Sequence, residues 1–116
     1  MIIHSKIVGM KIAMPDPARR EEIVRDCKKG EALILERIPN DPHDKNAVAV
    51  MRVTREKLGY VESEAAAKIV PEMEKNQTQF EGVIEKITGG APGFFASLFG
   101  GKETPLGFDI VITKKY

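Results

Sequence analysis

The sequence predicts a mainly β, α+β protein in which six short strands and two short helices form a strongly curved sheet or small barrel. Apolar, β-branched runs recur at short spacing along the chain, as they do in small barrels. These runs do not alternate with the long crossover helices that a doubly wound parallel sheet needs. The 116 residues are 42% hydrophobic and 30% charged, which favours one domain over residues 1–116 with a single core.

Six segments have the alternation or the β-branched composition of strands. They are residues 5–12, 32–38, 47–53, 58–61, 80–88 and 106–113. Gly9 lies inside the first segment and indicates a β-bulge or a close approach by another backbone. The last two segments are expected to pair as a hairpin.

A first helix is predicted over residues 18–27. Asp16 before Pro17 is typical of an N-cap followed by the first helical position. Gly30 is well placed to end the helix after two lysines.

A second helix is predicted over residues 64–75, with Ser63 as its N-cap and a run of three alanines near its start. Pro71 lies inside this range. Because proline removes one helical hydrogen bond, we expect a kink or a break into two pieces.

Residues 39–46 (PNDPHDKN) carry the densest turn signal of the chain. Proline fixes φ, and Asn and Asp side chains bond to the nearby backbone, so these residues favour turns. Asp41, Asp44 and Asn46 therefore have a structural interpretation as Asx-turn residues that hold a tight connection between two strands. A binding role for the same side chains stays open at this point.

A segment rich in glycine and phenylalanine, residues 89–107, separates the last two strands. Connections of this length are uncommon in a small domain and are often functional. Phe94, Phe95 and Phe99 can cover an open end of the barrel, form a flap that stacks on nucleic acid, or contact a protein partner or a second copy of the chain. The sequence does not separate these alternatives.

Charge is nearly balanced, with 18 lysines and arginines against 17 acids and a net charge of +1. This balance argues against a protein that holds nucleic acid mainly by bulk charge. One interpretation of the first third of the chain is a local basic patch around Lys11 and residues 19–29. The other is a solvated helix face with ion pairs such as Glu21–Arg25.

The cysteine content and the length of the apolar runs indicate the cellular compartment. Cys27 is the only cysteine, so neither an intramolecular disulfide nor a cysteine zinc site is available. No apolar run reaches the roughly 20 residues of a membrane span, and no secretory signal is expected. We therefore expect a cytoplasmic protein without membrane contact.

No catalytic constellation is visible in the sequence. Residues 100–102 (GGK) lack the rest of the phosphate-binding pattern G-x-x-x-x-G-K-[ST]. A metal site is one possible interpretation of His4, Asp41, His43 and Asp44, but their spacing matches no standard zinc pattern. We expect no cofactor, no metal and no enzymatic activity.

Three sequence pieces in a fixed order carry a family resemblance. They are Ile7-Val8-Gly9, residues 39–50 (PNDPHDKNAVAV) and Leu58-Gly59-Tyr60-Val61. Together they resemble the HIRAN domain, which occurs alone in bacteria and phages and at the amino end of SNF2-type DNA-repair ATPases. The resemblance covers roughly residues 5–87 and implies a small barrel related to the OB-fold.

For function, the resemblance implies binding of single-stranded DNA or of a free DNA 3′ end. In the DNA-binding member, stacked aromatics hold the last bases and an acidic side chain accepts the terminal hydroxyl. Carried over by position, Asp44 is the acceptor, His43 is a stacking residue, and Asp41 is its neighbour in the same turn. Lys11 and Tyr60 are then candidates for phosphate contacts.

Two positions depart from that pattern. Ile12 stands where a second stacking aromatic is expected, and Ser63 stands where the DNA-binding member has a lysine. We therefore expect weak binding with a shallow salt dependence, corresponding to about 2–3 neutralised phosphates. The alternative is a protein-interaction module on the same fold that uses the phenylalanine-rich segment.

Overall fold

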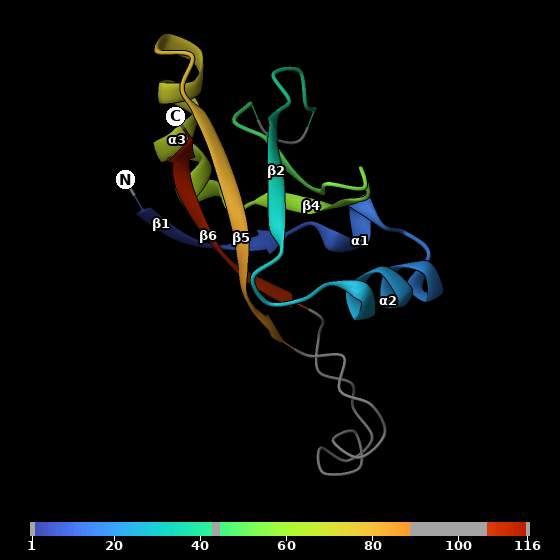
Figure 1. Ribbon diagram of the computed structural model, residues 1–116. Coiled ribbons are helices and arrows are strands. Elements are labelled where there is room, and N and C mark those ends of the chain that lie inside the picture. Colours follow the sequence, from blue (N-terminus) through green and yellow to red (C-terminus); the bar gives the residue numbers. More distant parts are fainter. Residues whose placement is uncertain (1, 43–44, 89–106, 116) are drawn as a thin grey trace.

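Six antiparallel strands close into a barrel in the order β1-β4-β3-β2-β5-β6 (Figure 1). The computed structural model describes residues 2–42, 45–88 and 107–115. The strands are β1 Ile2–Val8, β2 Ala32–Arg37, β3 Val48–Arg52, β4 Lys57–Val61, β5 Gln79–Thr88 and β6 Gly107–Lys115. The predicted mainly β fold with six strands is confirmed, and β5 and β6 pair as the expected hairpin.

The barrel interior is filled by one apolar side chain from every second strand position. In β6, for example, Phe108, Ile110 and Ile112 are almost fully buried, while the residues between them are half-buried. This alternation is what a strand with one face on the core requires. Helix α3 (Ser63–Lys75) adds its own apolar side chains, chiefly Ile69 and Val70, to the same core.

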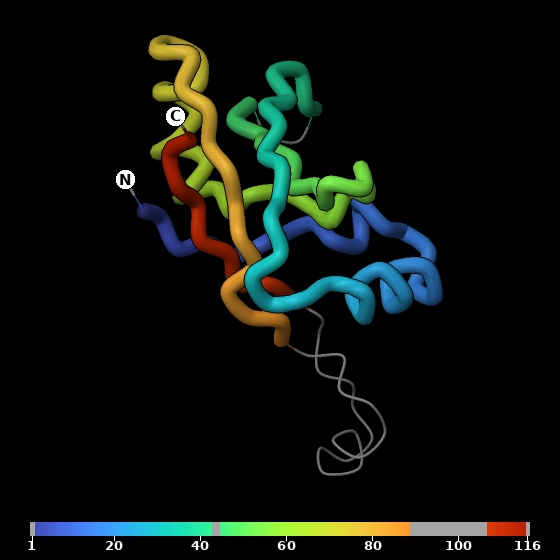
Figure 2. The backbone as a smooth tube through the Cα atoms, viewed as in Figure 1, coloured from blue at the N-terminus to red at the C-terminus, as the bar shows by residue number. Residues whose placement is uncertain are grey.

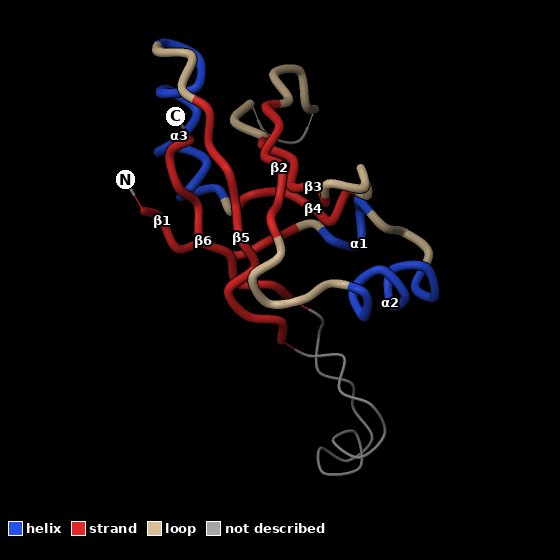
Figure 3. The backbone as a smooth tube through the Cα atoms, viewed as in Figure 1, coloured by secondary structure: helices blue, strands red, loops and turns tan. Residues whose placement is uncertain are grey.

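The helices lie at two sides of the strands (Figure 3). Helix α3 follows β4 and contacts β1 and β5. It lies near both described ends of the chain, whereas α1 (Met10–Ala13) and α2 (Pro17–Asp26) lie on the other side (Figure 1). Among the described helices, none is long and apolar enough to cross a membrane.

The first strand departs from its predicted range. It ends at Val8, because Gly9 has a φ of 68° and caps the short helix α1. Extended backbone does not continue through a left-handed residue, so the interpretation of Gly9 as a position inside the strand was wrong. Lys11 and Ile12 therefore lie on a helical turn and not on a strand surface.

The predicted capping of α2 is confirmed, since the Asp16 side chain accepts a hydrogen bond from the Ala18 N–H at 3.1 Å. In α3, Ser63 is the first helical residue, and Glu62 precedes it as the N-cap without a side-chain bond. The helix is continuous through Pro71, so the predicted break is absent. Pro71 has no N–H to donate to the Ala67 carbonyl. Both residues are exposed, so water can donate to this carbonyl instead.

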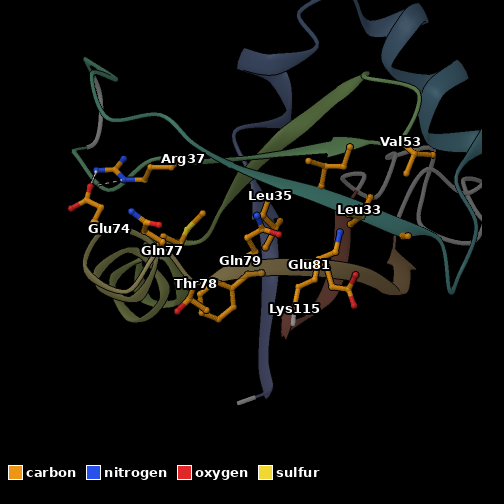
Figure 4. A pocket seen from close by; sticks show the side chains of 14 residues that line it. Leu33, Leu35, Arg37, Val53, Glu74, Gln77, Thr78, Gln79, Glu81 and Lys115 are labelled. Carbon is orange, nitrogen blue, oxygen red and sulfur yellow. Dashed lines mark hydrogen bonds and ion pairs between the residues drawn. The ribbon is translucent and has the colours of Figure 1, made fainter.

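Strands β2 and β5 separate beyond a short region of pairing (Figure 2). Only Ala32–Ile34 pair with Glu81–Val83. Past that point a groove of about 550 Å³ opens between β2, β5 and the end of α3 (Figure 4). Arg37 and Glu74 lie among its lining residues and contact each other.

Candidate nucleic-acid interface

Tyr60 lies on β4 between two neighbouring strands. It is paired with Val8 on β1 and with Ala49 on β3. Tyr60 is half-buried, and Val8 is 43% exposed. Helix α1 begins directly after Gly9, which lies against the Tyr60 ring, so its exposed residues Lys11 and Ile12 lie two and three positions along the chain from that contact. We call the set Val8, Lys11, Ile12, Lys57 and Tyr60 the Tyr60 face.

A bulge places Lys57 on the same side of β4 as Tyr60. Side chains three positions apart in a regular strand point to opposite faces. Here the register shifts between Val50 and Met51 of β3, and two buried residues separate the half-buried Lys57 and Tyr60. The Lys57 Nζ consequently lies over the Tyr60 ring, 4.5 Å from its centroid.

Two glycines allow this close arrangement. At Gly59 a Cβ would lie 2.5 Å from the Val8 carbonyl oxygen and 2.6 Å from the Ile7 Cγ2, so a side chain there would push β1 away from β4. At Gly9 a Cβ would lie 3.0 Å from the Tyr60 Cδ2. The Tyr60 ring therefore rests against the Gly9 backbone. The neighbour of Gly9 is thus a side-chain ring, and not another backbone as predicted.

Arg37 anchors the connection between β2 and β3. Its guanidinium donates to the carbonyls of Ile38 at 2.9 Å and Ala47 at 3.0 Å, and also to the carbonyl of Lys45. On its other side it pairs with the Glu74 carboxylate of α3 at 3.0 Å (Figure 4). One half-buried cation thus fixes both ends of the segment that carries the turn signal.

The anchored connection lies close to Tyr60. Ala47 closes the base of the connection, where its carbonyl accepts from the Ile38 N–H at 2.9 Å. Ala49, the cross-strand partner of Tyr60, is two residues further along, which corresponds to about 7 Å of extended chain. The fold therefore brings the base of residues 39–46 and the Tyr60 face to neighbouring positions on one wall of the barrel.

The cations of the described chain include ion-paired side chains and others, Lys11 and Lys57 among them, that are not ion-paired. Arg19, Arg25, Arg37 and Arg52 are all ion-paired with carboxylates. Lys11 and Lys57, within the described residues, have no carboxylate at ion-pair distance. The pairs of Arg19 and Arg25, including the expected Glu21–Arg25 pair at 2.5 Å, favour the solvated helix face over a basic patch for α2.

The predicted site residues are only partly described. Lys11 and Tyr60 lie together on the Tyr60 face, and Asp41 is half-buried in the anchored connection. His43 and Asp44 lie outside the described residues, as do Phe94, Phe95 and Phe99 of the phenylalanine-rich segment. His4 lies on β1 and contacts Glu85 at 3.1 Å. Within the described ranges no three metal-ligating side chains converge.

Sequence reasoning missed two residues of this region. The alternation of β4 assigns Lys57 to the face opposite Tyr60, and only the bulge reverses that assignment. Arg37 did carry a signal, because it is a charged residue at the end of an otherwise apolar strand directly before the turn-rich segment. Such a residue is placed to bond the carbonyls of the connection.

A closed six-stranded barrel with an aromatic side chain and unpaired cations on one outer face belongs to the class of small β-barrel binding modules. The family model of the HIRAN domain matches residues 3–112. The chain therefore belongs to the HIRAN domain family, as its motifs indicated.

Its curated relatives are much longer proteins. The chain is 41% identical over 54 residues to the helicase-like transcription factor of Oryctolagus cuniculus and 37% identical over 54 residues to that of Homo sapiens. Each match covers 47% of this chain and 5% of the relative. The chain thus matches a small part of those proteins.

Solved structures share the fold. The crystal structure of the HIRAN domain of human HLTF matches with a TM-score of 0.58 and 24% identity over 95% of this chain and 74% of that chain. A Lactobacillus plantarum protein matches with a TM-score of 0.68 and 15% identity over 100% of this chain and 98% of that chain. An NMR structure of the HLTF HIRAN domain in its DNA-bound conformation matches with a TM-score of 0.51 and 24% identity over 95% and 74% of the two chains.

Proposed function

We propose that this protein is a non-catalytic module that binds single-stranded DNA. The observation that carries the proposal is the Tyr60 face, where Lys11 and Lys57 lack carboxylate partners within the described chain and lie beside Tyr60 and the 64% exposed Ile12. Cations without internal partners are available to phosphates. The family fold supports the proposal, since a related HIRAN domain has been solved in a DNA-bound conformation.

The proposed mode of binding uses few charges. Lys11 and Lys57 neutralise phosphates, and the apolar side chain of Ile12 contacts a base. With a net charge of +1, long-range attraction contributes little, so affinity is modest. On this basis we expect a slope of log K against log salt of about −1.5 to −2, from roughly 2–3 phosphates.

The sharper form of the proposal is recognition of a free 3′ end by the connection that Arg37 anchors. In this form Asp44 accepts the hydrogen bond of the terminal hydroxyl, His43 stacks on the last base, and Asp41 supports the same turn. A carboxylate repels an internal phosphodiester but accepts a hydrogen bond from a hydroxyl. Such a site selects ends without a large positive charge.

Fluorescence anisotropy with 5′-labelled oligonucleotides tests both forms. We expect binding of single strands at low salt with a dissociation constant below about 100 μM, the range of weak nucleic-acid binding. A 3′ hydroxyl should bind better than a 3′ phosphate, and Asp44→Ala should remove that preference. Glu64→Ala, which removes an exposed carboxylate of α3, is the matched control and should keep it. No binding at low or moderate salt would refute the proposal.

A protein partner is the second candidate, favoured by the exposed apolar side chains of Val8 and Ile12. In that case the phenylalanine-rich segment and the Tyr60 face contact protein or a second copy of the chain. Deletion of residues 94–99 should then abolish self-association, measured by analytical ultracentrifugation, and leave any DNA affinity unchanged. A deletion that weakens DNA binding instead would assign the segment to nucleic acid.

A further inference from the structure

The arrangement of Lys57 over Tyr60 bears on how a nucleic-acid strand lies on this surface. We propose that the two residues form one phosphate-binding pair, in which the Lys57 ammonium and the Tyr60 hydroxyl donate hydrogen bonds to the same phosphodiester. This inference rests on the proposed function and assigns the chemical group that this part of the face takes. Tyr60 then contacts the backbone of the strand and does not stack on a base.

The surroundings of the Tyr60 ring disfavour stacking on the face that Lys57 covers. The Lys57 Nζ lies 4.5 Å from the ring centroid and covers one ring face. The Gly9 backbone lies against the ring at Cδ2 and Cε2. A base needs an open ring face to stack, so a base that stacked on this face would have to displace the Lys57 ammonium. We infer that a ligand meets the hydroxyl end of the half-buried ring.

The Lys57 ammonium keeps its capacity to donate hydrogen bonds. Its contact with the ring is electrostatic and uses none of its three N–H donors. No carboxylate lies at ion-pair distance from Lys57 in the described chain. By contrast Glu56, its neighbour in sequence, is taken by Arg52 at 2.9 Å and by Arg19 at 3.2 Å. The ammonium is therefore held in place and still available to an anion.

Geometry makes the two donors act together. The bulge that brings Lys57 to the outer side of β4 holds both side chains on one strand, with two buried residues between them. The strand backbone fixes their separation, and the ring limits the positions that the ammonium takes. A tetrahedral phosphate presents two non-bridging oxygens, one for each donor.

The test combines a salt series with neutral-backbone probes. Anisotropy titrations use 5′-labelled single-stranded oligonucleotides that carry one methylphosphonate at successive linkages, with a fully charged oligonucleotide as reference. For the wild-type chain we expect one linkage at which the methylphosphonate weakens binding about fivefold. Lys57→Gln and Tyr60→Phe should each weaken binding of the charged strand and lose the sensitivity at that linkage.

The salt slope and the linkage profile distinguish phosphate binding by Lys57 from a purely structural role. Lys57→Gln should lower the magnitude of the salt slope by about 0.7, the value for one phosphate on a single strand, and Lys57→Arg should restore it. Lys75→Gln, at an exposed lysine in the last turn of α3, is the control and should keep both the slope and the linkage profile. Thermal unfolding verifies that each variant is folded.

The outcomes are distinct. If the wild-type chain binds no oligonucleotide, the proposed function fails and this inference with it. If it binds, but Lys57→Gln or Tyr60→Phe keeps the wild-type linkage profile, the phosphate pair is refuted and the proposed function stands. Loss of the profile in both variants, with the control unchanged, supports the pair.

Discussion

Two regions of the barrel carry cations whose surroundings differ. One is the Arg52 side, formed by Arg52, Asp26, Glu31 and Glu56, and the other is the Tyr60 face. Arg52 is buried, with 7% exposure. It donates to Glu31 at 2.7 Å, to Asp26 at 2.9 Å and to Glu56 at 2.9 Å. Its N–H groups thus serve carboxylates of the chain itself. On the Tyr60 face the cations have no such partners within the described residues.

The difference shows why the net charge of the chain is a poor guide to its function. Arg52 stabilises the fold, because it joins the end of α2, the residue before β2 and the turn after β3. Lys57 sits five residues further along the chain, at the start of β4, and remains available to an external anion. The sum of charges in the sequence counts both cations equally, whereas the fold uses one internally and leaves the other exposed.

Removing Arg52 should have the largest effect on stability. Arg52→Met leaves three carboxylates close together without their cation, and we expect the free energy of unfolding to fall by about 3 kcal/mol. Urea denaturation measures the change. Arg25→Met, which removes an exposed ion pair on α2, is the control and should cost less than about 0.5 kcal/mol. Equal effects of the two variants would contradict the distinction between buried and exposed charge.

Gly59→Ala tests the close contact between β1 and β4, on which the Tyr60 face depends. The added Cβ would meet the Val8 carbonyl oxygen at 2.5 Å, and backbone cannot move aside as a flexible side chain can. We expect a loss of about 2 kcal/mol in the free energy of unfolding and a weaker affinity for single strands. Gly82→Ala is the matched control, because its nearest neighbour would be the Leu33 Cβ at 3.4 Å.

Local patterns predicted the barrel well. Alternation and β-branched runs gave all six strands, and Asp16 before Pro17 placed the start of α2. They could not give α1, because a four-residue helix is too short to show a helical period and begins at a glycine that also suits a strand. Gly59 belonged to a motif in the sequence. The reason for a glycine there, the close approach of β1 to β4, became clear only from the pairing of these two strands.

The site was harder to predict, for a related physical reason. The pairing of Lys57 with Tyr60 follows from a one-residue shift between β3 and β4, which no pattern within β4 reveals. The partners of Arg52 come from three separate segments of the chain. Side-chain roles that depend on long-range register are therefore invisible to a reading of local sequence.

Cys27 provides a pH test of the Arg52 side. Burial raises the pKa of the Cys27 thiol to about 11, with the nearby Arg52 opposing the shift. A raised pKa means that the folded state holds the proton more tightly than the unfolded state, so stability is full below pH 9 and falls between pH 9 and 11. We expect this group to contribute a loss on the order of 2 kcal/mol across that window.

The measurement is urea denaturation of the wild-type chain and of Cys27→Ala at several pH values. Stability of Cys27→Ala should fall less steeply between pH 9 and 11, although the variant starts lower because it leaves a small cavity. Parallel pH profiles would show that other groups cause the alkaline loss.

Arg37 combines features of both regions. It is ion-paired like Arg52, and it also holds a candidate binding segment, residues 39–46. Arg37→Gln should lower the free energy of unfolding by about 1.5 kcal/mol, because the three carbonyls of the connection lose the guanidinium as a donor. Hydrogen exchange followed by NMR should accelerate at Lys45 and Asn46 more than in β6. Glu74→Gln removes only the ion-pair partner and should have a smaller effect. Uniform acceleration throughout the barrel would mean that Arg37 stabilises the whole fold and not the connection.

The smallest expected effect is a gain at Ile12, and it tests whether the Tyr60 face is a binding surface. Ile12 is 64% exposed on α1 and has no π face, so a base gains only apolar contact from it. Ile12→Tyr adds a stacking surface, and we expect about 1 kcal/mol of additional affinity, roughly a fivefold tighter dissociation constant for single-stranded DNA by anisotropy. Ile2→Tyr is the matched control, because Ile2 is equally exposed at 68% but lies at the other end of β1. A gain at Ile12 alone locates the strand beside Lys57 and Tyr60. Equal gains at both positions mean that any exposed aromatic suffices, and the contrast between an internally paired side and an open face then no longer identifies the site.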